Sequence, residues 1–85
     1  MVLANGATPR RVTILGATGS VGQNTLDLIN RSPDDYRVVA LTAQRNVELL
    51  ASLAKQCNAG LAVIGDEDCY GALQDALAGT SVQVA

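Results

Sequence analysis

Three glycines at intervals of three residues separate an apolar, β-branched run from an amphipathic segment near the start of the chain. They are Gly16, Gly19 and Gly22 in the stretch RRVTILGATGSVGQNTLDLI, residues 10–29. A strand, a glycine-rich turn and a helix in this order are typical of a dinucleotide-binding unit. Such a turn must reverse sharply, approach a pyrophosphate closely and let the helix pack tightly on the strand, and glycine allows this because it has no Cβ. The pattern therefore predicts a phosphate-binding turn.

Hydrogen-bond donors for such a phosphate lie at the start of the following helix. The backbone amides from Gly19 to Gly22 are expected to point at the phosphates together with the positive end of the helix dipole. Thr18 and Ser20 can add hydroxyl donors. An ordinary strand-to-helix turn with Ser20 as its N-cap stays open as an alternative, because the spacing is G-x-x-G-x-x-G rather than G-x-G-x-x-G. A Walker A loop is excluded, because no Gly-Lys-Ser/Thr follows.

Short β-rich runs alternate with helical patterns along the chain. Strands are predicted over residues 11–15, 37–42, 61–64 and 81–84, and helices over 20–30, from the N-cap Asn46 onward and from the N-cap Asp66 to about Ala78. This order predicts an α/β fold, a Rossmann-like parallel sheet with right-handed crossovers and helices on both faces.

Two local details of these helices are also predicted. The first helix is expected to carry an apolar stripe of Val21, Thr25, Leu28 and Ile29. Gly79 is expected to end the last helix in the left-handed conformation.

The end of the second predicted strand distinguishes between cofactors. In an NAD site, a carboxylate about 20 residues beyond the glycines accepts hydrogen bonds from the adenine ribose. The stretch from Thr42 to Asn46 contains no carboxylate. Arg45 supplies a planar cation for a 2′-phosphate, and Gln44 or Asn46 can donate beside it. These residues predict NADPH rather than NADH; a solvated Arg45, with Asn46 only capping a helix, is the alternative.

Composition limits the partners of the chain. Of its 85 residues 48% are hydrophobic and 16% are charged, which is typical of a globular protein. Six Lys and Arg residues are too few for a basic face, so no nucleic-acid partner is expected. No apolar run approaches the roughly 18 residues of a membrane span, so no membrane partner is expected either.

The cysteines and the N-terminus suggest a cytoplasmic protein. Cys57 and Cys69 form no C-x-x-C pair and the chain has no His, so two ordinary thiols are favoured over a disulfide or a metal site. Residues 1–9, MVLANGATP, show no signal or transit pattern and are interpreted as a flexible lead-in. Residues 10–85 stop just after the last predicted strand, so we expect them to be the front part of a larger NADPH-binding domain.

The glycine turn and the segments after it resemble the N-terminal, NADPH-binding portion of the 1-deoxy-D-xylulose 5-phosphate reductoisomerases. The resemblance rests on TILGATGSVGQNTLDLI, SPDDYRVVALTAQRNVELL and AVIGDED, and covers nearly the whole chain from about Arg11. It implies an NADPH-dependent oxidoreductase of non-mevalonate isoprenoid biosynthesis. Such enzymes rearrange 1-deoxy-D-xylulose 5-phosphate and reduce the product to 2-C-methyl-D-erythritol 4-phosphate. The resemblance also implies a divalent cation, Mg²⁺ or Mn²⁺, and a homodimer.

Carried over by position, the resemblance implies nucleotide contacts at Thr18, Gly19, Ser20, Val21, Gln44, Arg45 and Asn46. With Gly16 and Gly22 of the turn, these are the predicted cofactor-binding residues. Two of them depart from the family pattern, because relatives often have glycine at the position of Gln44 and lysine at that of Arg45. Gln44 leaves open how closely the loop approaches the ribose, whereas Arg45 keeps the charge.

No catalytic or metal-binding residue is predicted within the chain, because the resemblance implies that the metal carboxylates, the substrate-phosphate site and the lid lie beyond Ala85. The acidic run from Asp66 to Asp68 is expected to cap a helix rather than bind a metal. Asp27 is interpreted as solvated or locally hydrogen-bonded. Tyr36 and Tyr70 have no basic partner at the spacing of a short-chain dehydrogenase.

Two other functions stay open. An NADP-dependent semialdehyde or acyl-phosphate reductase shares the Gly-Ala-Thr-Gly turn, but it needs a nucleophilic cysteine in a context that neither Cys57 nor Cys69 offers. A non-catalytic NADP-sensing module would need no catalytic group at all.

Overall fold

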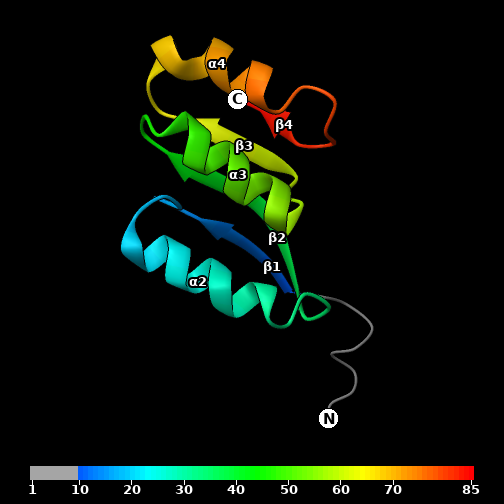
Figure 1. The fold of residues 1–85 in the computed structure, drawn as a ribbon. Helices are drawn as coiled ribbons and strands as arrows, with labels where there is room; N and C mark the ends of the chain where they lie inside the picture. The colour runs from blue at the N-terminus through cyan, green and yellow to red at the C-terminus, as the bar shows by residue number, and fades with distance from the viewer. Residues whose placement is uncertain (1–9) are drawn as a thin grey trace.

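The structure, a computed structural model, describes residues 10–85 as a four-stranded parallel sheet with intervening helices (Figure 1). The elements are β1 (Arg10–Ile14), α2 (Ser20–Asn30), β2 (Tyr36–Ala43), α3 (Val47–Cys57), β3 (Leu61–Ile64), the short 3₁₀ helix η1 (Glu67–Cys69), α4 (Tyr70–Ala76) and β4 (Gln83–Val84). The predicted α/β parallel sheet is confirmed. The lead-in predicted over residues 1–9 lies outside the described residues.

The strand order β1-β2-β3-β4 follows the sequence, so each helix connects two neighbouring parallel strands. Right-handed crossovers that all advance in the same direction place their helices on the same face of a sheet. One continuous apolar core agrees with this arrangement, because it joins the sheet residues Ile14, Leu41 and Ile64 to Leu26 of α2 and Leu50 of α3.

The other face of the sheet is less covered. The aligned residues Thr13, Ala40 and Leu61 lie outside the apolar core, and Thr13 is exposed. Val39, which a register shift leaves as an extra residue in β2, is also exposed. Within residues 10–85 the helices thus cover one face of the sheet. We expected helices on both faces, and those of the second face are not among the described residues.

The buried side of α2 differs from the predicted stripe. Gly22, Leu26 and Ile29 are buried, at the i, i+4 and i+7 spacing of one helical face. Val21 and Leu28 are instead 80% and 64% exposed. The prediction was wrong for these two residues and for the exposed Thr25. The expected stripe left out Leu26 and Gly22, through which the helix packs on the core and on the turn.

Helix ends follow the sequence more closely. Asn46 caps α3, because its Oδ1 accepts a hydrogen bond from the Leu49 N–H at 3.2 Å. Gly79 has the predicted left-handed conformation, with φ +82°. The prediction of one helix up to about Ala78 was wrong, because the segment divides into η1 and α4, and α4 ends at Ala76 with Leu77 as its C-cap. β1 ends one residue before the prediction, so Leu15 lies outside the strand and is exposed.

Candidate nucleotide-binding site

The glycine turn closes tightly after β1. Gly16 adopts φ +65°, a left-handed conformation that disfavours a side chain, and its carbonyl oxygen accepts a hydrogen bond from the Gly19 N–H at 3.0 Å. A Cβ at Gly22 would lie 2.7 Å from the Ala17 Cα and 2.9 Å from the Ala17 carbonyl oxygen. The first glycine therefore makes the reversal and the third lets the helix approach the turn, as the spacing predicts.

Two residues that the sequence did not single out hold this turn in place. Thr42, near the end of β2, accepts through Oγ1 from the Gly16 N–H at 3.0 Å and through its carbonyl oxygen from the Ala17 N–H at 2.7 Å. Gln23 donates from Nε2 to the Thr18 carbonyl oxygen at 2.9 Å. The turn is thus fixed both to the neighbouring strand and to its own helix.

The start of α2 has no side-chain cap. Gly19 is the N-cap, in extended conformation, and no side chain accepts from the first helical amides. The alternative in which Ser20 caps the helix is therefore wrong, because Ser20 is the first helical residue. The amides of Ser20, Val21 and Gly22 have no acceptor within the helix, since the first turn of any α-helix leaves its N–H groups unpaired. Such a helix start is suited to bind an anion.

The loop after β2 lies at the same edge of the sheet, since the carboxyl ends of parallel strands share one edge. Gln44 contacts Gly65 closely enough that a Cβ at Gly65 would overlap its Oε1. Asn46 uses its Oδ1 to cap α3, which leaves its side-chain NH₂ group as a donor. The hydroxyl group of Thr42 connects this strand end to the glycine turn. The predicted contact residues thus gather at one edge.

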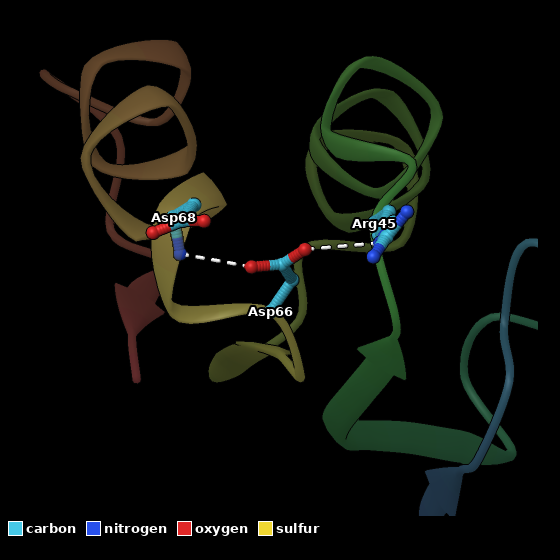
Figure 2. Close-up of polar contacts among 3 residues, drawn as sticks. All are labelled: Arg45, Asp66 and Asp68. Atoms are coloured by element: carbon cyan, nitrogen blue, oxygen red, sulfur yellow. Dashed lines mark hydrogen bonds and ion pairs between the residues drawn. The ribbon is translucent and has the colours of Figure 1, made fainter.

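Arg45 forms an ion pair with a carboxylate from a different loop. Its Nε lies 2.9 Å from Oδ2 of Asp66, in the loop between β3 and η1 (Figure 2). The other carboxylate oxygen of Asp66 accepts from the Asp68 N–H at 3.0 Å, so Asp66 caps η1 as predicted. The pairing with Arg45 was missed because the two residues are 21 positions apart. The adjacency of the second and third predicted strands was the signal that could have revealed it.

The structure bears on where a metal ion could be held. Within residues 10–85, no group of three or more His, Cys, Asp or Glu side chains is placed to hold a metal ion. No residue of the chain is therefore assigned to the divalent cation that the resemblance implies. Asp27 forms an ion pair with Arg31 at 2.9 Å, which confirms its local role.

Cys57 does not resemble an activated nucleophile of this site. Both are free thiols, as predicted. Burial raises the pKa of the Cys57 thiol, which lowers its thiolate fraction at neutral pH. Cys57 ends α3 beside a cavity of about 400 Å³ at the amino end of β2, so it lies at the opposite end of the sheet from the glycine turn.

No helix in the part of the chain that the structure describes has the length and apolar character of a membrane span.

Comparison with known proteins identifies the family. Residues 12–85 match the family model described as 1-deoxy-D-xylulose 5-phosphate reductoisomerase. The chain is 60% identical over 77 residues to the reductoisomerase of Zymomonas mobilis and 55% identical over 78 residues to that of Rhizobium rhizogenes. These alignments cover 91% and 89% of this chain but 20% of each relative. The chain thus spans about one fifth of the length of these curated relatives.

Solved structures agree with the sequence comparison. The Zymomonas mobilis reductoisomerase in complex with NADPH superposes with a TM-score of 0.90 at 59% identity, over 92% of this chain and 21% of that one. A reductoisomerase in complex with NADPH, fosmidomycin and magnesium gives a TM-score of 0.81 at 34% identity, over 88% of this chain and 19% of that one. The glycine turn, the parallel sheet and the sequence match lead to the same conclusion: the chain belongs to the 1-deoxy-D-xylulose 5-phosphate reductoisomerase family.

Proposed function

We propose that this chain is the NADPH-binding portion of an enzyme that converts 1-deoxy-D-xylulose 5-phosphate to 2-C-methyl-D-erythritol 4-phosphate in non-mevalonate isoprenoid biosynthesis. The observation that carries the proposal is the superposition on the NADPH complex of the Zymomonas mobilis enzyme, at 59% identity. The uncapped start of α2 supports it, because that helix end has free amides at the place where the fold binds pyrophosphate.

Each predicted residue then has a physical role. Gly16 and Gly22 shape the turn, and the amides of Gly19, Ser20 and Val21 donate to the pyrophosphate, with hydroxyl groups from Thr18 and Ser20 beside them. Arg45 binds the 2′-phosphate, and the Asn46 NH₂ group donates next to it. Gln44 packs over Gly65 and shapes the loop that faces the adenosine ribose. NADPH supplies the hydride, and these residues hold its adenosine half.

The remaining parts of the reaction belong to other residues of the enzyme. One related reductoisomerase structure is in complex with magnesium and another contains fosmidomycin and magnesium, and we extend Mg²⁺ or Mn²⁺ dependence to this enzyme. A cytoplasmic homodimer without nucleic-acid or membrane partners is part of the same proposal. The homodimer and the location are what membership of the family implies, and the net charge of −2 argues against a nucleic-acid partner.

A chimera tests this function directly. Residues 10–85 replace the matching segment of the Zymomonas mobilis reductoisomerase, and turnover of 1-deoxy-D-xylulose 5-phosphate with NADPH is followed by loss of absorbance of the reduced cofactor. The proposal predicts a folded chimera with activity within about tenfold of the parent enzyme, because a tenfold change corresponds to only about 1.4 kcal/mol. A chimera that folds and binds NADPH but does not turn over would instead favour an NADP-sensing module.

The position of Cys57 does not fit the acyl-phosphate reductase alternative. Its mechanism needs an activated cysteine near the nicotinamide. Burial raises the pKa of Cys57, and this thiol lies at the opposite end of the sheet from the turn. The same chimera checks the point, since replacement of both cysteines by alanine should leave its turnover in place.

A further inference from the structure

The guanidinium group of Arg45 is held from one side by a fixed carboxylate. Asp66 contacts Arg45 Nε through Oδ2 at 2.9 Å and accepts the Asp68 N–H through Oδ1 at 3.0 Å (Figure 2). The Asp66 side chain is 21% exposed, whereas that of Arg45 is 77% exposed. Asp66 is therefore the anchored member of the pair and Arg45 the exposed one.

This ion pair contributes little to folding, because its cation is largely exposed and exposed pairs are screened by water and salt. Its effect is to restrict the orientation of Arg45. A guanidinium group has five N–H donors in a planar fork, so a contact through Nε leaves the terminal NH₂ groups able to bind an oxyanion. The pair thus orders a long side chain without occupying its phosphate-binding end.

We propose that Asp66 is a positioning residue that increases the preference for a 2′-phosphorylated dinucleotide by holding Arg45 in its binding orientation. This inference rests on the proposed NADPH-binding function. A side chain that is ordered before binding loses less conformational freedom when the phosphate arrives, so the free protein already has part of the bound arrangement.

The Asp66 carboxylate could reduce the preference for NADPH in two ways, by repelling the 2′-phosphate or by binding a ribose hydroxyl. The observed geometry weakens both effects. Repulsion of the phosphate is reduced, because the negative charge faces both the Arg45 guanidinium and the amide of Asp68. Direct binding of a ribose hydroxyl, as in an NAD site, is disfavoured because both carboxylate oxygens already accept a protein donor. Asp66 is therefore expected to act through Arg45 and not through the ribose.

The test compares Asp66→Asn with Asp68→Asn in the full chain. Both variants remove one negative charge from the same loop, and asparagine keeps an oxygen that can cap η1. The Asp68 side chain forms no ion pair with Arg45 in the described structure, and its backbone N–H donates to Asp66. Dissociation constants for NADPH and NADH are measured for each variant by titration calorimetry. Circular dichroism and Tm report folding.

Asp66→Asn should weaken NADPH binding about three- to tenfold and change NADH binding less than about twofold, as expected for lost preorganisation of one side chain. Asp68→Asn should leave the ratio of the two constants unchanged. In an Arg45→Ala background, Asp66→Asn should have no further effect on NADPH binding. Asp66→Ser keeps a capping oxygen without the charge, so it should change the NADPH and NADH affinities as Asp66→Asn does. It takes the place of Asp66→Asn if that variant does not fold.

Three results would overturn the inference. Tighter NADPH binding by Asp66→Asn would show that the carboxylate repels the phosphate. A larger loss for NADH than for NADPH would show that it binds the ribose. An undiminished effect in the Arg45→Ala background would show that it acts independently of Arg45.

The proposed function has a separate readout in the same experiment. If the unmodified chain binds NADPH and NADH equally, the proposed cofactor site fails. If the unmodified chain prefers NADPH and loses that preference with Arg45→Ala, while Asp66→Asn changes nothing, the role of Asp66 alone fails.

Discussion

Gly22 lies so close to Gly16 that a Cβ at position 22 would stand 2.5 Å from the Gly16 carbonyl oxygen. The obstacle is backbone on the turn itself, which is hydrogen-bonded to Thr42 and has little freedom to move. The third glycine of the turn is therefore required by packing between helix and turn, independently of any ligand.

Gly22→Ala should destabilise the chain by about 1–3 kcal/mol, the usual cost of overpacking a close contact. Gly71→Ala is the matched control, because a Cβ at this exposed position in α4 meets nothing within 4 Å. That control should keep or raise stability, since alanine is favoured over glycine in helices by about 1 kcal/mol. Urea unfolding followed by circular dichroism compares the two. Equal midpoints for both variants would contradict the packing account.

Leu50→Ala should lower the free energy of unfolding by about 2–5 kcal/mol, because Leu50 is fully buried in the core between α3 and the sheet. Leu28→Ala removes the same atoms from a side chain that is 64% exposed and should change stability by about 0.5 kcal/mol or less. Urea unfolding of both variants measures the difference. A larger loss for Leu28→Ala would mean that α2 packs through the stripe expected from the sequence.

Arg45→Ala should weaken NADPH binding about 10- to 100-fold and NADH binding only slightly, because charge-assisted hydrogen bonds to phosphate contribute about 1.5–3 kcal/mol. Arg37→Ala is the control, since Arg37 is an exposed arginine near the amino end of β2, away from the glycine turn. Dissociation constants of both nucleotides are measured for each variant. Equal losses for NADPH and NADH would remove Arg45 from the 2′-phosphate site.

Stability should depend on Cys57 at alkaline pH. Burial raises the thiol pKa above its ordinary value of 9.0, so the folded state keeps the proton where the unfolded chain releases it. The contribution of the neutral thiol is therefore complete below about pH 9 and decreases as the pH rises through the folded pKa. Unfolding free energies of the chain and of Cys57→Ala, measured from pH 7 to 10.5, should converge at high pH. A constant difference would contradict the burial effect.

The sequence predicted most of the fold because its signals are local. The bounds of α2 and β3 agree with the prediction, and Asn46 and Asp66 have the capping roles that their residue types indicate. Gly79 has the predicted left-handed conformation but lies three residues after the end of α4. The buried face of α2 was missed because it is set by the close approach of the helix to the turn at Gly22, and the expected stripe contained neither Gly22 nor Leu26.

The candidate site was predictable to the same extent. The glycines and the loop residues around Arg45 could be proposed as candidates because each group lies directly after a predicted strand in the sequence. The contacts from Thr42 to Gly16 and from Asp66 to Arg45 could not, since each joins residues from neighbouring strands, 26 and 21 positions apart. Contacts of this kind can be predicted only when the order of the strands in the sheet is known.

The most direct test of the account is titration of the chain with NADPH and NADH under identical conditions, with binding heat as the readout. The two nucleotides differ only by the 2′-phosphate, so their comparison isolates the proposed role of the loop after β2. The account predicts saturable binding in which NADPH is at least about tenfold tighter, as one charge-assisted contact implies. Equal affinities, or the absence of saturable binding by a folded chain, would contradict it.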